Sequence, residues 1–151
     1  MRRSFLKILG FSFVSYLLIP LSSILAATKT LFNKNLTDEQ KDIMFNEGTE
    51  RPFSSELNKE NRKGFYHCAN CGAKLFASTS KFDSGTGWPS FSEALPGAFK
   101  TKVDLKFGMV RTEYHCAKCG VHHGHVFNDG PSTNGKRFCN NGLCLIFKPS
   151  N

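Results

Sequence analysis

Six cysteines are the residues of this sequence best suited to chemistry, and four of them form two pairs. Cys68 and Cys71 make one CxxC pair, Cys116 and Cys119 make another, and a glycine directly follows each pair. Two thiolates on a tight turn face one ion, and two such turns complete the tetrahedral shell that zinc prefers. We therefore predict one structural zinc ion per chain. Two disulfides or two redox pairs are the alternatives, but a redox pair needs a βαβ context that the surrounding sequence does not offer.

Cys139 is the best candidate for a nucleophile among the remaining two cysteines. If residues 137–141 form a strand, the alternation of side chains places Arg137, Cys139 and Asn141 on one face. A cation and an amide beside the thiol would stabilise the thiolate and hold a polar substrate oxygen. A buried, inert cysteine beside a surface arginine is the alternative that the spacing leaves open.

Two further stretches carry residues that can do chemistry. His122, His123 and His125 precede a turn, and imidazole is the usual acid near neutral pH. Taken alone, they could form a second metal site or be histidines satisfied by local hydrogen bonds, and the latter is the commoner case. Trp88, the single tryptophan, lies in a loop between glycine and proline. It is either a core residue or an aromatic wall for an apolar ligand group such as a methyl.

The elements that must position these groups are short. Thr37 and Gln40 have the spacing of a capping box, which predicts a short helix with Ile43, Met44 and Phe45 on its apolar side. We expect this helix to end at Gly48.

From residue 64 onward, short runs with β propensity alternate with clusters of glycine, proline, asparagine and aspartate. The predicted strands are residues 65–67, 74–76, 109–111 and 138–147. This pattern predicts a small, irregular, mainly antiparallel all-β domain with one or two short helices at its N-terminal end.

The N-terminus has the pattern of an export signal. Arg2, Arg3 and Lys7 precede an apolar stretch, residues 8–25, which closes on two alanines. The paired arginines resemble a twin-arginine signal, which exports folded proteins, so we expect the bacterial periplasm. An ordinary secretory signal or an uncleaved anchor is the alternative. We therefore divide the chain into a signal peptide at 1–27, a lead-in at 28–35 and a single domain at 36–151.

The charge of the chain does not indicate a nucleic-acid partner. The formal net charge is +8, but three of these charges lie in the predicted signal peptide. Acidic residues are interspersed among the remaining lysines, and no basic run or arginine stripe is present in the sequence. We expect contact with a membrane only through the signal peptide.

Taken together, these residues resemble the methionine-R-sulfoxide reductase family of the B type. The matching segments are residues 36–37, 48–54, 64–72, 81–91, 110–113, 116–120, 124–131 and 136–142. The resemblance implies an all-β fold of two antiparallel sheets opened like a tent, with a four-cysteine zinc site in many members. It also implies an enzyme that repairs oxidised proteins by reducing methionine-R-sulfoxide in peptides or proteins.

The resemblance implies a mechanism centred on Cys139. Its thiolate attacks the sulfoxide sulfur while an acid protonates the oxygen, and methionine leaves a sulfenic acid on the cysteine. By analogy, His122 and His125 supply or relay the proton. Asn141 and Arg137 would orient the sulfoxide and the thiolate. Asp129 would hold Arg137 or a histidine in place, and Trp88 would bind the methyl group of the substrate.

Three positions depart from this pattern or leave it open. Thr86 stands where many members have a recycling cysteine, and His123 stands where the family often has an apolar residue. Cys144 lies five residues beyond Cys139, about 16 Å away in an extended strand, whereas a disulfide needs Cα atoms within about 7 Å. Only a bend at residues 141–142 would bring the two cysteines together. We therefore expect Cys144 to be a packing residue, and an external, thioredoxin-like dithiol to reduce Cys139.

Two other functional classes are compatible with parts of the sequence. A non-enzymatic zinc module that binds a protein or nucleic acid would show clustered surface cations and would not need Trp88, His125 and Cys139 together. A redox carrier would use the CxxC pairs as its active thiols and would contain no zinc.

Overall fold

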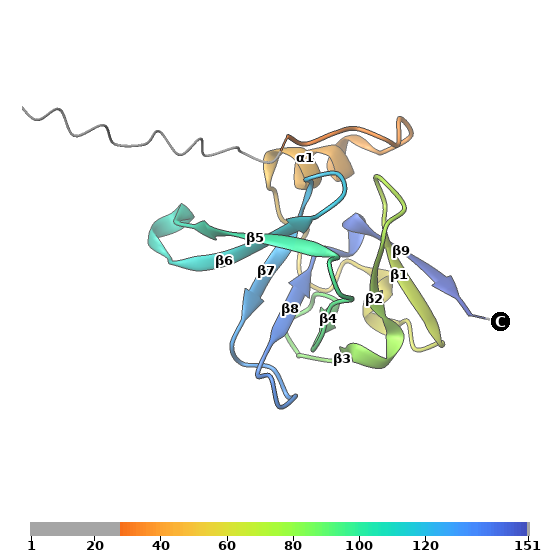
Figure 1. Cartoon of the computed structure of the whole chain (residues 1–151), viewed down its shortest axis with the longest axis vertical. Coiled ribbons are helices and arrows are strands. Elements are labelled where there is room, and N and C mark those ends of the chain that lie inside the picture. The colour runs from red at the N-terminus through yellow and green to blue at the C-terminus, as the bar shows by residue number, and fades with distance from the viewer. Residues whose placement is uncertain (1–27, 151) are drawn as a thin grey trace, which may run out of the picture.

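Two antiparallel sheets and one α-helix make up the computed structural model, which describes residues 28–150 (Figure 1). The smaller sheet has the order β2-β1-β9, with β1 at Gly64–Cys68, β2 at Lys74–Ala77 and β9 at Leu145–Pro149. The larger sheet has the order β3-β4-β8-β7-β6-β5. Its strands are β3 (Lys81–Phe82), β4 (Ser90–Phe91), β5 (Phe99–Asp104), β6 (Arg111–Cys116), β7 (His122–Phe127) and β8 (Arg137–Asn140). The predicted all-β, mainly antiparallel class is confirmed.

The helix α1, Asp38–Asn46, begins as the sequence predicts. Thr37 accepts a hydrogen bond from the backbone N–H of Gln40, and the Gln40 side chain accepts one from the backbone N–H of Thr37. The helix ends slightly earlier than expected, because Glu47 adopts the left-handed conformation with φ 62° and caps the last turn. Ile43 and Met44 are buried against the core.

Within residues 28–150, four 3₁₀ turns lie between these elements: η1 (Glu56–Lys59), η2 (Ser78–Ser80), η3 (Lys106–Gly108) and η4 (Gly142–Cys144). The turn η4 corrects one prediction, since the expected continuous strand at 138–147 is divided into β8 and β9, which belong to different sheets. The prediction at 109–111 is also largely wrong, because β6 begins only at Arg111. Strands β3, β4, β5 and β7 were not expected.

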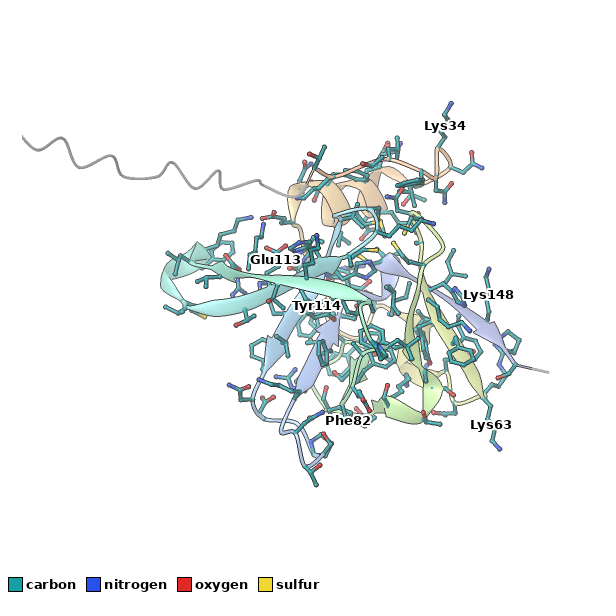
Figure 2. All side chains as sticks on the ribbon, in the orientation of Figure 1. Lys34, Lys63, Phe82, Glu113, Tyr114 and Lys148 are labelled. Atoms are coloured by element: carbon teal, nitrogen blue, oxygen red, sulfur yellow. The ribbon has the colours of Figure 1, made fainter. Side chains whose placement is uncertain are left out.

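Aromatic side chains fill the space between the two sheets (Figure 2). The rings of Phe76 and Phe91 stack with centroids 4.0 Å apart, and Tyr66 meets Phe91 edge to face at 4.9 Å. Tyr114 packs on Phe99 at 4.6 Å. Each large apolar side chain that becomes fully buried stabilises the fold by about 1.5–3 kcal/mol, so this cluster is what joins the sheets on their inner side.

The predicted signal peptide, residues 1–27, lies outside the described residues. Within residues 28–150, no helix has both the length and the apolar character that a membrane crossing requires.

Candidate active site

The two CxxC pairs meet where the two sheets come together. Strand β1 of the smaller sheet ends at Cys68, and strand β6 of the larger sheet ends at Cys116. Each pair is followed by a glycine whose backbone N–H closes the turn on the first cysteine's carbonyl, at 2.9 Å in the first pair and 2.8 Å in the second. The sulfur atoms of all four cysteines lie within 4.8 Å of one another.

The distances between these sulfur atoms fit a single tetrahedral metal ion. The Sγ atoms of Cys68 and Cys119 are 3.7 Å apart, and those of Cys71 and Cys116 are 3.6 Å apart. A tetrahedron with zinc–sulfur bonds of 2.3 Å has edges of about 3.8 Å. These separations are far longer than a disulfide bond, and all six cysteines are free thiols. The four predicted ligands therefore form a site that can hold a metal ion, consistent with zinc.

Cys139 lies at a small pocket on the larger sheet. The pocket has a volume of about 130 Å³ and is lined by Thr49, Trp88, Arg111, His125, Phe127, Cys139 and Asn141. A water molecule takes about 30 Å³ of liquid volume, so the pocket has room for the end of one side chain. Cys139 is the only thiol among the described residues that lines it.

Strand pairing determines the neighbours of Cys139. In β8, Cys139 lies between Ser90 of β4 and His125 of β7. Next to His125, Gly124 allows β7 to approach β8 closely, because a Cβ atom there would collide with the carbonyl oxygen of Cys139. This close pairing places an imidazole and a thiol side by side on one face of the sheet.

Burial and hydrogen bonding have opposite effects on the Cys139 thiol. Burial raises its pKa, whereas the positive charge of Arg137 and hydrogen bonds from Thr86 and Arg137 lower it. The net direction is upward, so burial outweighs the stabilisation of the thiolate that the sequence led us to expect. In the free protein the thiol is therefore mainly protonated near neutral pH.

Arg137 is held in place by Asp129. Its Nε and a terminal nitrogen donate to the two carboxylate oxygens of Asp129 at 2.8 and 2.9 Å, and its guanidinium lies 4.4 Å from the centre of the Phe127 ring. This paired contact with Arg137 is the main reason why the pKa of Asp129 is lowered.

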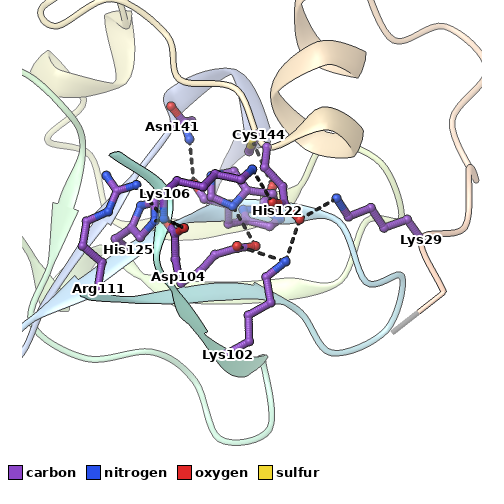
Figure 3. Close-up of polar contacts among 12 residues, drawn as sticks. Lys29, Lys102, Asp104, Lys106, Arg111, His122, His125, Asn141 and Cys144 are labelled. Atoms are coloured by element: carbon purple, nitrogen blue, oxygen red, sulfur yellow. Dashed lines mark hydrogen bonds and ion pairs between the residues drawn. The ribbon is translucent and has the colours of Figure 1, made fainter. Parts of the chain in front are cut away.

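His125 is oriented by a carboxylate that sequence reasoning missed. Its Nε2 lies 2.7 Å from Oδ2 of Asp104, which also accepts a hydrogen bond from Arg111 at 2.6 Å (Figure 3). Burial raises the pKa of Asp104, but the backbone N–H of Lys106, His125 and Arg111 together lower it to about 2. Burial lowers the pKa of His125, and the bond to Asp104 partly offsets this effect.

His122 lies behind His125, away from the pocket. In a regular strand, residues three apart face opposite sides, but the β6–β7 register shifts between Tyr114 and His115. The rings of His122 and His125 consequently lie 5.6 Å apart. His122 is almost fully buried, and its Nδ1 lies 3.0 Å from Oε1 of Glu113. That distance is typical of an ion pair, although neither atom has a partner at hydrogen-bond geometry.

A chain of charges connects this histidine to the helix. Lys102 bridges Glu113 at 3.1 Å and Glu47 at 2.6 Å, and Glu47 also receives Lys29 at 3.0 Å and Lys106 at 2.7 Å (Figure 3). Burial raises the pKa of Glu47, but these lysines lower it well below its usual range. The end of α1 is thus fixed against β5 and β6.

Glu50 organises the other side of the pocket. Its backbone carbonyl accepts from the indole Nε1 of Trp88 at 3.1 Å, and its backbone N–H donates to Oδ1 of Asn141 at 3.1 Å. Its buried carboxylate accepts from the backbone N–H groups of Gly142 and Leu143. One amide hydrogen of Asn141 goes to the carbonyl of His123, at 3.1 Å. The side chains of Trp88 and Asn141 are therefore held by backbone contacts at the pocket wall.

Cys144 and His123 lie outside the pocket. Cys144 is fully buried, and its thiol donates to the carbonyl of His122 at 3.5 Å. His123 is also fully buried, and burial lowers its pKa to about 4, so its ring is neutral. Both residues have the surroundings of core packing.

The predicted site residues thus divide into two groups. Trp88, His125, Cys139 and Asn141 line the pocket, whereas Arg137, Asp129 and His122 support it from outside. Sequence reasoning missed four residues that position this set: Glu50, Asp104, Arg111 and Glu113. Three of them lie in segments that carry the family resemblance, and Asp104 had no local signal at all.

The sequence comparisons point to one family. The SelR domain family matches residues 36–149. Three curated relatives are each named peptide methionine sulfoxide reductase MsrB. The relative from Variovorax paradoxus is 57% identical over 66% of this chain and 74% of its own length. The relative from Agrobacterium fabrum is 49% identical over 78% of this chain and 88% of its own length. The relative from Methanosarcina barkeri is 48% identical over 78% of this chain and 83% of its own length.

Proposed function

The chain belongs to the family of B-type methionine-R-sulfoxide reductases, and we propose that it reduces methionine-R-sulfoxide in peptides and proteins with Cys139 as the nucleophile. The observation that carries this proposal is the pocket itself. It combines one thiol, one imidazole backed by a carboxylate, and aromatic walls in a volume of about 130 Å³.

The reaction begins at the Cys139 sulfur. The thiolate attacks the sulfoxide sulfur and forms a sulfur–sulfur bond while the oxygen takes up a proton. The oxygen then moves to the cysteine sulfur as the substrate's sulfur–oxygen bond and the new sulfur–sulfur bond break. The products are methionine and a Cys139 sulfenic acid, so the substrate gains two electrons and the cysteine loses two. Because burial raises the pKa of Cys139, the thiol has to give up its proton as it reacts, and this proton balances the one that the sulfoxide oxygen takes up.

We assign the proton donor to His125 and a supporting role to His122. His125 lines the pocket and lies in register with Cys139, whereas His122 is buried behind it. Asp104 fixes which ring nitrogen of His125 faces the pocket and favours the protonated imidazole. Arg111, held by the same carboxylate, adds a permanent positive charge near the developing oxygen anion.

The two kinds of pocket wall account for the choice of one epimer. His125, Arg111 and Asn141 offer polar groups to the sulfoxide oxygen, while Trp88 and Phe127 offer apolar surface to the methyl group. A sulfoxide of the opposite hand would have to exchange these two groups, which would place oxygen against the aromatic surface and leave polar groups unpaired.

An external dithiol completes the cycle. Cys139 has no second thiol beside it in the pocket, Thr86 occupies the position next to it, and Cys144 is buried and faces a backbone carbonyl. Two thiols of a thioredoxin-like donor would therefore reduce the sulfenic acid, releasing water and forming a disulfide in the donor. This proposal makes the enzyme dependent on a partner for every turnover.

The metal site has a separate, structural role. Four thiolates suit zinc, and Cys68, Cys71, Cys116 and Cys119 would hold it where β1 and β6 end. Zinc bound there would tie the two sheets together. We further propose that the chain is exported after folding, since zinc can load in the reducing cytoplasm before the thiols meet an oxidising compartment. Replacing both Arg2 and Arg3 with lysine should abolish the export of zinc-loaded protein; unchanged export would refute this route.

A steady-state assay tests the proposed activity. The zinc-loaded protein is supplied with dithiothreitol and with the separate R and S sulfoxides of blocked methionine, and methionine formation is followed. We expect turnover of the R epimer alone and none in Cys139→Ser. Turnover of the S epimer alone, or persistent activity in Cys139→Ser, would refute the proposal.

A further inference from the structure

The end of the β5–β6 hairpin exposes a cluster of large apolar side chains. Leu105, Phe107, Met109 and Val110, which we call the apolar tip, are each at least half exposed, and Phe107 reaches 85%. The hairpin projects from the body of the protein beside α1 (Figure 1). Single exposed apolar residues are common on protein surfaces, but a contiguous group usually marks an interaction site.

The turn between β5 and β6 requires a left-handed backbone at position 107, since the carbonyl of Lys106 accepts from the N–H of Met109 at 3.3 Å, but it does not require phenylalanine there. The backbone of Phe107 is left-handed, with φ 60° and ψ 25°, and Gly108 follows with φ 70°. Glycine or asparagine adopts this conformation at lower cost than an aromatic residue does. Because the Phe107 ring is mainly exposed, its burial within the protein does not compensate for this strain.

The apolar tip continues the wall of the substrate pocket. Arg111 lines the pocket, and its guanidinium lies 6.0 Å from the centre of the Phe107 ring. Asp104 pairs with Arg111 across the hairpin and holds it at 2.6 Å, so the pocket wall ends where the tip begins. A polypeptide with its oxidised methionine in the pocket would pass within a few residues of the tip, since an extended chain advances about 3.3 Å per residue.

We propose that the apolar tip binds apolar side chains that flank the oxidised methionine in an extended segment of the substrate polypeptide. This inference rests on the proposed function. Methionine is mostly a core residue, so the segments around it are rich in apolar side chains, and they become accessible when a damaged protein unfolds. The enzyme therefore favours methionine sulfoxides in unfolded, apolar segments over those in polar surface loops.

The charges around the tip favour a polypeptide over a lipid surface. Surface-bound elements combine exposed apolar residues with free basic residues that attract anionic lipids. Here Lys102 and Lys106 are both paired with Glu47, and Arg111 is paired with Asp104. The cations nearest the tip are thus engaged in ion pairs within the protein rather than free.

Two peptides and a blocked amino acid test this proposal. Each peptide carries one methionine-R-sulfoxide, flanked either by leucine and phenylalanine or by serine and glycine. Phe107→Asn removes the ring and suits the left-handed backbone. We expect it to raise KM for the apolar-flanked peptide about fivefold, as follows from losing part of one aromatic contact. KM should not change for the serine-flanked peptide or for blocked methionine-R-sulfoxide.

Val103→Ser is the matched control. Val103 is 67% exposed on the same hairpin, but it alternates with Asp104 and therefore faces away from the pocket. The Val103→Ser substitution should leave KM for all three substrates unchanged. Equal KM values for the two peptides, or a Phe107→Asn variant that matches the unaltered protein, would overturn the proposal. An equal rise in KM of Phe107→Asn for the blocked amino acid would also overturn the proposal, because the tip would then act only through the pocket.

A binding measurement separates failure of this inference from failure of the proposed reaction. In Cys139→Ser, fluorescence of the single Trp88 reports binding of the apolar-flanked peptide without turnover, and we expect about fivefold weaker binding when Phe107→Asn is added. Unchanged binding would overturn the role of the tip even if the enzyme is active. Sedimentation with phosphatidylglycerol vesicles tests the alternative of a membrane. If the protein sediments with the vesicles, and Phe107→Asn abolishes this binding but leaves peptide binding unchanged, the tip binds a membrane and the proposal is overturned.

Discussion

Replacing Asp104 with asparagine tests how the protein controls its proton donor. The substitution preserves the size of the side chain but removes the negative charge that His125 and Arg111 share. Asp104 accepts from these residues at 2.7 and 2.6 Å. A hydrogen bond with a charged partner contributes about 1.5–3 kcal/mol, and the exposure of the two side chains, 6% for Asp104 and 15% for His125, leaves little solvent screening.

This energy predicts a measurable loss of activity. Because the asparagine oxygen can still accept one hydrogen bond, we take the lower part of that range, which corresponds to about a 10- to 30-fold fall in kcat/KM. The pH profile should also move. Asp104 raises the pKa of His125, so Asp104→Asn lowers it. Activity should decline as the pH rises through the pKa of His125, which burial holds below its ordinary value, and in the variant this decline should begin at a still lower pH.

The assay is the reduction of blocked methionine-R-sulfoxide across a pH series, with thermal unfolding of each protein as a parallel readout. Asp38→Asn removes the same charge from a fully exposed position at the start of α1 and should leave the profile unchanged. If Asp104→Asn keeps its activity within twofold and its profile does not move, His125 is not the donor that Asp104 controls. A lower activity with an unmoved profile and a reduced melting temperature would assign Asp104 a purely structural role.

Three further predictions follow from other contacts. Thr86→Cys should form an intramolecular disulfide with Cys139 after one turnover, because the Thr86 hydroxyl already lies within hydrogen-bonding reach of that thiol; thiol counting that still finds both sulfurs free would contradict this. Cys71→Ser should lower both the zinc content and the melting temperature, and one zinc per chain with unchanged unfolding would show that this cysteine is not a ligand. Tyr114→Phe removes a buried hydrogen bond to Asn140. Its loss should lower the free energy of unfolding by about 1 kcal/mol and Tm by about 4 °C. An unchanged Tm would show that this bond contributes nothing to stability.

Local spacing predicted part of the fold and of the site. The two CxxC pairs and the capping box at Thr37 and Gln40 depend on residues a few positions apart, so the sequence alone reveals them. The strand at Arg137–Asn140 was predicted for the same reason. The family resemblance then selected Cys139 among six cysteines.

The residues that orient the proton donor depend on distant pairing, which the sequence does not reveal. Asp104 reaches His125 only because β5 pairs with β6 and β6 pairs with β7. Strand β5 is itself mostly exposed and shows no alternation of apolar and polar residues. The register shift that brings His122 beside His125 likewise depends on how β7 pairs with β6.

Trapping the oxidised cysteine in a single turnover tests the central claim most directly. The reduced protein is mixed with one equivalent of blocked methionine-R-sulfoxide, without a reductant and with a reagent that labels sulfenic acids, and is then analysed by peptide mass spectrometry. We predict one methionine released per chain and the label on Cys139 alone. Methionine release without a label on Cys139, or a disulfide between Cys139 and Cys144, would contradict the account.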